Sequence, residues 1–147
     1  MKKDIENRSD IDQLMNAFYS RALADDLIGF IFTDVAKLDL EHHLPVIGDF
    51  WETLLFQTGE YARHGRNPMR VHAALDLKTP LLPRHFERWL EIFTGTVDKS
   101  FEGERADHVK LRAAAIANNI LRYLDREPLD IPDSELNNYA EEGGLAA

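Results

Sequence analysis

Apolar residues recur at spacings of three and four along most of this chain, and proline and glycine interrupt that pattern at intervals. The first run holds Ile11, Leu14, Met15, Phe18, Ala22 and Leu23. Such spacing is typical of an amphipathic helix, which buries one stripe and leaves the rest in water. No run alternates apolar and polar residues for long enough to indicate a sheet. The sequence therefore predicts an all-α fold.

The interruptions predict where the early helices begin and end. Ser9 is a plausible N-cap for the first helix. A short apolar segment follows from Leu27 to Phe32, with Gly29 inside it. Pro45 is tolerated only in the first turn of a helix, so the next helix should run from about Leu44 to Phe56.

The second half of the chain predicts one short helix and two long ones. Residues Gly59 to Pro68 have the composition of a loop, and Pro68 suits the first position of a short helix. Helical spacing resumes from Phe86 to Val97 and again from Val109 to Leu124. Helices of such unequal length suit globin-like packing better than a symmetric four-helix bundle.

Length and composition limit the alternatives. A chain of 147 residues forms one domain of ordinary size, which we place at residues 1–127. Residues 128–147 carry five carboxylates and neither Lys nor Arg, so we expect a flexible acidic tail. The absence of cysteine excludes disulfides, iron–sulfur clusters and thiolate zinc sites.

The charge of the chain bears on its partners. Seventeen basic residues against twenty-six acidic ones give a net charge of −9, which repels nucleic acid and anionic lipid. The sequence shows neither an apolar stretch of membrane-spanning length nor a signal segment, so we expect a cytoplasmic protein without nucleic-acid or membrane partners.

Two histidine-containing segments are candidates for metal chemistry. Glu41, His42 and His43 are adjacent, so on a helix they point in different directions and make a poor zinc site. His72 lies on the short helix opened by Pro68, where a neutral imidazole can coordinate haem iron. Taken alone, His72 fits an ordinary surface or core histidine better than a haem ligand.

Other candidates gain weight only in combination. His43, Ile47 and Phe50 share one helical stripe, and Tyr19 shares a stripe with Met15. Each of these patterns, and Trp89 as well, also fits ordinary core packing. The segment from Tyr61 to Arg70 carries a basic cluster, which suits either haem propionates or plain solvation: Arg63, His64, Arg66 and Arg70.

An ordered set of short motifs connects these segments. In chain order it comprises Phe18-Tyr19, Gly29-Phe30-Ile31-Phe32, His43-Leu44-Pro45, Asp49-Phe50-Trp51, Thr58-Gly59-Glu60-Tyr61, Asn67-Pro68-Met69, His72, and His85-Phe86-x-Arg88-Trp89-Leu90. In order and rough spacing, the set resembles the group III truncated haemoglobins over about Ile11 to Leu124.

The resemblance implies a truncated globin fold whose helices sandwich haem b. It implies His72 as the proximal iron ligand and a distal side formed by Tyr19, His43, Ile47 and Trp89. The rest of the haem pocket would comprise Phe32, Phe50, Leu75, Phe86, Phe93 and Ile116, with Arg66 or Arg70 at a propionate. Whether His42 or His43 faces the pocket is open at this point.

The implied function is haem chemistry with O₂, NO or CO. Three donors beside the ligand exceed what storage needs, so we expect redox chemistry, such as NO dioxygenation or a peroxidase-like reaction, rather than transport. We expect Tyr19 and Trp89 to donate hydrogen bonds and His43 to act mainly as a gate. A reductase would be a separate protein. The alternatives are an O₂/NO binding or sensing module without turnover and, more remotely, a haem-free helical interaction protein.

Overall fold

A computed structural model describes residues 1–59, 61, 64–65 and 67–131. Within these residues the ordered elements are helical: α1 (Arg8–Leu23), the π-helix η1 (Ile31–Val35), α2 (Leu40–Phe56), α3 (Pro68–Lys78), α4 (Pro83–Ser100) and α5 (Glu104–Tyr123). The all-α prediction is confirmed.

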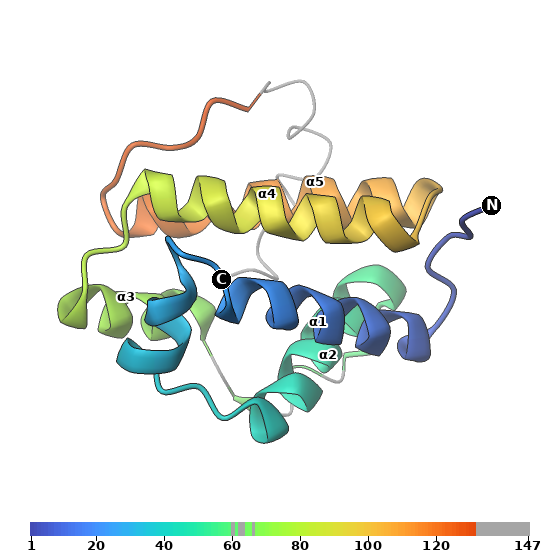
Figure 1. The fold of residues 1–147 in the computed structure, drawn as a ribbon, viewed down its shortest axis with the longest axis horizontal. Helices are drawn as coiled ribbons and strands as arrows, with labels where there is room; N and C mark the ends of the chain where they lie inside the picture. The colour runs from blue at the N-terminus through green and yellow to red at the C-terminus, as the bar shows by residue number, and fades with distance from the viewer. Residues whose placement is uncertain (60, 62–63, 66, 132–147) are drawn as a thin grey trace.

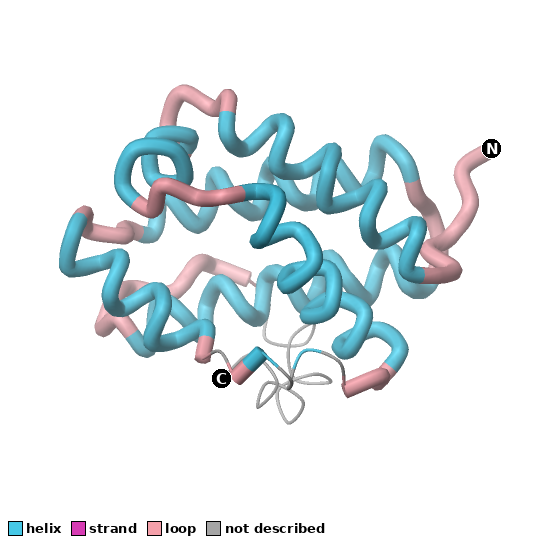
Figure 2. Tube along the Cα trace, turned by 90° about the horizontal axis from the view of Figure 1, so that it is seen from below, coloured by secondary structure: helices cyan, strands magenta, loops and turns pink. Residues whose placement is uncertain are grey.

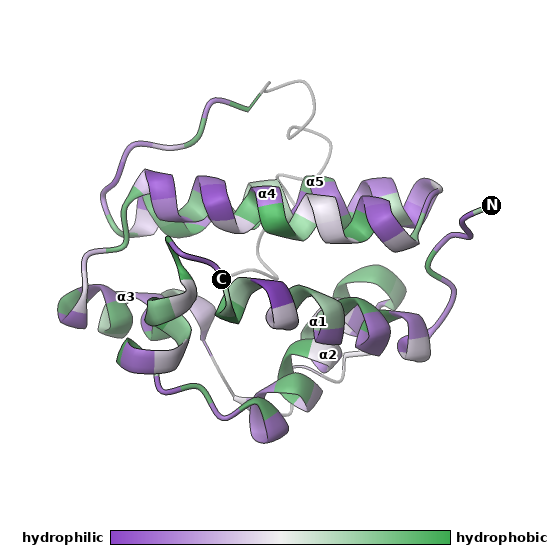
Figure 3. Ribbon diagram, viewed as in Figure 1, coloured by the Kyte–Doolittle hydropathy of each residue, from purple (hydrophilic) through white to green (hydrophobic). Residues whose placement is uncertain are grey.

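The helices enclose one hydrophobic core. Figure 1 shows α4 and α5 side by side, with α1 running beneath α4 and α2 crossing beneath α1. Helix α3 lies at one end of the molecule, and the view from below in Figure 2 shows the same arrangement. Colouring by hydropathy shows apolar and polar residues interleaved along each helix, as expected for amphipathic helices around a shared core (Figure 3).

Asparagine side chains begin two of the helices. Asn7, rather than the predicted Ser9, is the N-cap of α1, and its side chain accepts a hydrogen bond from the backbone N–H of Asp10 at 3.0 Å. Asn67 caps α3 in the same way, accepting from the N–H groups of Met69 and Arg70 at 3.0 and 3.3 Å. Both asparagines satisfy backbone donors that the first turn of a helix leaves open.

The predicted start of α2 was wrong by four residues. The helix begins at Leu40, so Pro45 lies inside it rather than in its first turn. A proline at this position deprives only the Glu41 carbonyl of its helical partner. Because Glu41 is exposed, water can satisfy that carbonyl, and the first turns of the helix tolerate the proline.

The segment before α1 is attached to the start of α5. The carboxylate of Asp4 accepts hydrogen bonds from the backbone N–H groups of Arg105 and Ala106 at 3.0 and 2.8 Å. Asp4 therefore caps a helix that begins a hundred residues later. None of the helices in the described part of the chain combines the length and the apolar character needed to cross a membrane.

The chain after α5 turns back along that helix. Asn118 of α5 donates to the Leu129 carbonyl at 3.2 Å and accepts from the Leu129 N–H at 2.7 Å. Residues 132–147 lie outside the described residues, so the expected boundary between a domain at 1–127 and a flexible tail at 128–147 stays a prediction.

Candidate functional site

One face of α4 carries aromatic side chains that connect most of the expected pocket. Trp89 stacks on Phe93 with ring centroids 5.3 Å apart, and Phe93 stacks on Trp51 at 5.1 Å. Phe18 of α1 meets Trp89 edge-on at 5.8 Å. The apolar residues assigned to the site belong to the core or pack against it, as the following set shows: Ile47, Phe32, Phe50, Leu75, Phe86, Trp89, Phe93 and Ile116.

Tyr19 and His43 form the central polar contact of this cluster. The Tyr19 hydroxyl and His43 Nε2 are 2.7 Å apart, a hydrogen-bond distance. The Tyr19 ring is 7% exposed and lies edge-on to Phe32 and to the His43 ring, at 6.0 and 5.2 Å. Burial raises the pKa of Tyr19, so the phenol keeps its proton and remains a donor at neutral pH.

His42 and His43 have different partners in the structure. His42 Nδ1 lies 2.6 Å from the Asp39 carboxylate, and the His42 side chain is 83% exposed. His43 is half-buried and turned toward Tyr19. In this conformation His43 is a partner of Tyr19, whereas the expectation from sequence was mainly a gate.

The backbone of its own helix orients His72. The His72 Nδ1 atom lies 2.7 Å from the Pro68 carbonyl oxygen. Because a carbonyl only accepts, Nδ1 carries the hydrogen, and the lone pair of the neutral ring resides on Nε2. Burial lowers the pKa of His72 against the opposing effect of this hydrogen bond, so the ring is neutral at pH 7.

The residues present fit a haem. A haem ligand needs a neutral imidazole whose far nitrogen is free of hydrogen, and an acceptor on the near nitrogen provides that tautomer. The Phe86 ring lies 6.4 Å from the His72 ring, which gives the imidazole an apolar neighbour. His72, the aromatic face of α4 and the Tyr19–His43 pair thus supply the donor set and the apolar lining that haem requires.

The basic loop is only partly described. Arg63 and Arg66 lie outside the described residues, so the expected contact of Arg66 with a propionate stays a prediction. His64 of this loop hydrogen-bonds the Asp49 carboxylate of α2 at 2.7 Å. Arg70 is exposed and lies about 160° around α3 from His72, so its position does not favour the expected propionate contact.

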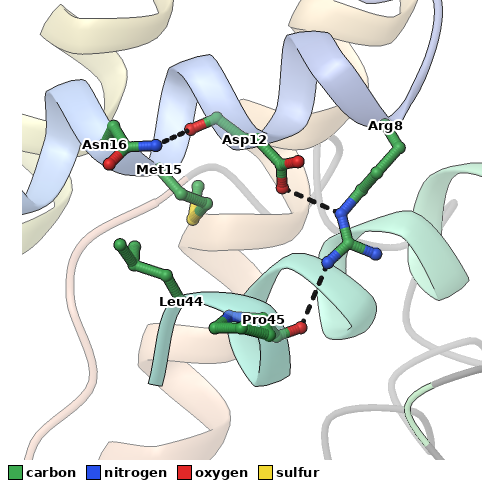
Figure 4. Close-up of a pocket in the computed structure, with 6 residues that line it drawn as sticks. All are labelled: Arg8, Asp12, Met15, Asn16, Leu44 and Pro45. Atoms are coloured by element: carbon green, nitrogen blue, oxygen red, sulfur yellow. Dashed lines mark hydrogen bonds and ion pairs between the residues drawn. The ribbon is translucent and has the colours of Figure 1, made fainter. Parts of the chain in front are cut away.

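A separate pocket of about 230 Å³ lies between α1 and the start of α2 (Figure 4). The Arg8 guanidinium at its edge contacts the carboxylates of Asp12 and Glu52 at 2.8 and 3.0 Å, and it also pairs with Asp49. Because three carboxylates already surround this cation, the pocket offers no free charge for an anionic ligand. The pocket contains none of the residues expected to contact haem.

Reasoning from the sequence missed two residues that organise the site. Phe18 contacts Tyr19, Trp89 and Phe93 edge-on, at 5.0, 5.8 and 5.5 Å, and so joins the two halves of the cluster. Trp51 stacks on Phe93 and is 3% exposed. Both lie within the motifs that carry the resemblance, but their spacing alone indicates only core packing.

Two known proteins are similar to this chain, one in sequence and one in structure. The "Group 3 truncated hemoglobin ctb" of Campylobacter jejuni is 29% identical over 127 residues, covering 84% of this chain and 95% of the relative. The crystal structure of a group III truncated hemoglobin from Campylobacter jejuni matches with a TM-score of 0.72 and 28% identity, over 84% and 95% of the two chains. No family model matches the chain. The resemblance predicted from the sequence is confirmed: the chain has an all-α globin fold and is similar to group III truncated haemoglobins in sequence and structure.

Proposed function

We propose that this chain binds haem b through Nε2 of His72. The observation that carries the proposal is the 2.7 Å hydrogen bond between Nδ1 of the half-buried His72 and the Pro68 carbonyl. That bond holds the imidazole in the tautomer that a metal ligand needs and limits its rotation. The similar proteins are named as truncated hemoglobins, which supports the same cofactor.

When bound, haem supplies an open coordination position for O₂, NO or CO and one-electron redox chemistry at iron. The residues of this chain then decide which ligand is favoured and what happens to it. Phe32, Trp89 and Phe93 exclude water with their rings. In such a low-dielectric setting, a well-placed donor stabilises developing negative charge far more than it does in water.

Tyr19 is the main donor in this proposal, and His43 positions it. When His43 Nε2 carries a hydrogen, it donates to the Tyr19 oxygen, and the phenolic hydrogen is then free to turn toward a polar ligand. A donor chain of this kind polarises each member and strengthens the last hydrogen bond. Trp89 contributes an indole N–H, which can only donate.

We propose NO dioxygenation as the reaction. One NO and one O₂, together with one electron from a separate reductase, give one nitrate ion. Strong donation by Tyr19 slows the loss of O₂ and draws electron density toward it, both of which favour reaction with NO over release. This donor arrangement is the observation that favours turnover over transport.

The test is to mix the ferrous, O₂-saturated protein with NO in a stopped-flow instrument and to measure nitrate in the product. We expect about one nitrate for each NO consumed, and a slower second cycle unless a reductant is present. Binding of NO without nitrate would contradict the redox proposal and would leave the protein as an O₂/NO binding or sensing module. A Soret band in the purified protein tests haem binding separately from the reaction.

A further inference from the structure

The outer face of α3 is exposed and has a distinctive composition. On a helical wheel its members fall within an arc of about 120°, so they form one continuous strip. Leu77 is 90% exposed and Val71 is 42% exposed, so the strip presents two aliphatic side chains to solvent. The exposed residues that make up this outer face are Arg70, Val71, Ala74, Leu77 and Lys78.

The charge of this strip differs from that of the whole chain. The chain has a net charge of −9, yet every residue on the outer face of α3 is apolar or basic. The one acidic residue of the helix, Asp76, lies away from the strip. Its carboxylate accepts from the Leu81 N–H at 2.7 Å and from Arg126 at 3.0 Å. Basic side chains beside an apolar centre complement a partner surface that carries carboxylates around an apolar patch.

The strip lies directly behind His72. Ala74, near the middle of the outer face, is two residues from His72, so the two side chains point in nearly opposite directions across the helix. An α-helix with its side chains is about 10–12 Å across. A protein docked on the outer face would therefore be separated from the His72 imidazole by roughly the thickness of one helix.

We propose that the outer face of α3 docks an acidic protein that donates single electrons to the haem site. The inference rests on the proposed function, because turnover needs one electron for each cycle. A reduced [2Fe–2S] centre gives up that electron and becomes oxidised by one electron, while ferric iron becomes ferrous, and no proton or bond changes. Centres of the plant-type ferredoxin class, near −400 mV, are strong enough reductants for this step.

The first experiment measures docking without turnover. The ¹⁵N-labelled ferrous CO form of the full chain is titrated with an oxidised, acidic plant-type ferredoxin at low ionic strength. We expect amide shifts concentrated between Arg70 and Lys78, which disappear as salt is added because the Debye length shortens. Shifts confined to α1 or α5, or no binding at low salt, would overturn the proposal. Sedimentation of the protein without ferredoxin tests whether a second copy occupies the face, and a dimer built through α3 would also overturn it.

Matched charge reversals sharpen the result. Lys78 and Lys99 are both exposed and both lie in the last turn of a helix, α3 and α4 respectively. Lys78→Glu should slow association with ferredoxin about tenfold at low salt, since a rim charge acts mainly on the association rate. Lys99→Glu makes the same charge reversal and should change the rate less than about twofold by the same reasoning. Equal effects would mean that net charge alone drives the encounter. Leu77→Ser, at an exposed position, should weaken binding without affecting folding.

These experiments distinguish a failure of the docking site from a failure of the proposed function. In each variant the Soret spectrum and chemical reduction by dithionite report on haem binding alone. If dithionite-reduced protein turns NO into nitrate but ferredoxin neither binds α3 nor reduces the protein, only the docking site is wrong. If ferredoxin reduces the protein through α3 but no nitrate forms, the docking site stands and the reaction assignment fails.

Discussion

Helices α1 and α3 carry the proposed distal donor, Tyr19, and the proposed iron ligand, His72, but hold them in different ways. Helix α1 buries a full stripe from Asp10 to Ala22, and Tyr19 lies within that stripe among Phe18, Phe32 and His43. Helix α3 buries Met69 alone, and His72 is oriented by one hydrogen bond to its own backbone. The distal side is therefore formed by the core, whereas α3 depends on local interactions.

This difference indicates which of the two helices gains more stability when haem binds. A ligand that binds only the folded form stabilises the folded segments that it contacts. Helix α1 already has its core contacts, so haem adds little to its order. Helix α3 has few buried contacts, so a bond from His72 to iron would supply much of its stability. Local opening in a globin without haem should accordingly begin at α3.

Replacing the proposed iron ligand should have the largest effect. His72→Ala removes the only imidazole that we assign to iron, and haem affinity should fall by more than the roughly 10–100-fold typical of losing a residue that merely supports a ligand. Added imidazole should restore part of the ferrous CO spectrum. The haem content and the CO spectrum of the purified variant are the measurements. An unchanged spectrum would exclude His72 as the ligand. The contrast drawn above between α1 and α3 would then have no basis.

Replacing the distal donor should affect ligand release rather than haem binding. A hydrogen bond to a charged acceptor contributes about 1.5–3 kcal/mol, so Tyr19→Phe should speed O₂ dissociation roughly ten- to a hundredfold. CO dissociation should change far less, because CO is less polar. His43→Leu removes only the partner of Tyr19 and should change O₂ dissociation about two- to tenfold, as expected for a neutral hydrogen bond. If His43→Leu has the larger effect in stopped-flow measurements, His43 is the distal donor.

A change of pH should destabilise α3 in acid and α1 in alkali. Burial lowers the pKa of His72 below its ordinary value of 6.5, so the folded haem-free protein binds fewer protons than the unfolded chain below that pH. The stability of α3 should be complete above pH 6.5 and decline as the pH falls. Burial raises the pKa of Tyr19 above 10, so α1 should weaken only as the pH rises past 10.

Hydrogen exchange of the haem-free protein, followed helix by helix at pH 7.5, 6 and 5, checks this contrast. His85 is buried too, and its pKa is lowered by burial and by Arg84, so it contributes to acid sensitivity with the same sign. His85→Gln therefore serves as the control for the α4 contribution. If amide hydrogen exchange speeds up equally in α1 and α3 as the pH falls, His72 is not the group that makes α3 sensitive to acid.

The smallest expected effect comes from the two helix caps. Asn7→Ala and Asn67→Ala each remove a side chain that accepts from backbone N–H groups, which costs about 0.5–2 kcal/mol. Asn7→Ala should lower the free energy of unfolding, because α1 unfolds together with the core. Asn67→Ala should mainly speed haem loss, because α3 opens locally. Denaturant titration measures the free energy of unfolding, and transfer of haem to apomyoglobin measures haem loss. If both variants change these two quantities equally, α3 unfolds only with the whole domain.

Much of the fold could be predicted because helical spacing and breaking residues act locally. Pro68 predicted the start of α3 correctly, and the run from Phe86 to Val97 predicted α4. The start of α2 was placed wrongly because the cost of Pro45 depends on whether the Glu41 carbonyl reaches water. The cap of α1 was placed two residues late because Ser9 and Asn7 are both good caps, and the sequence alone does not choose between them.

The sequence by itself determined the helical class, the positions of most breaks and the set of residues that carries the likeness to truncated haemoglobins. Only the tertiary structure decided that His43, not His42, pairs with Tyr19, and that Phe18 and Trp51 join the aromatic cluster on α4. Spacing fixes which residues share a face of one helix. Which face meets which neighbour depends on how separate helices pack, and that is decided by contacts between residues far apart in the chain.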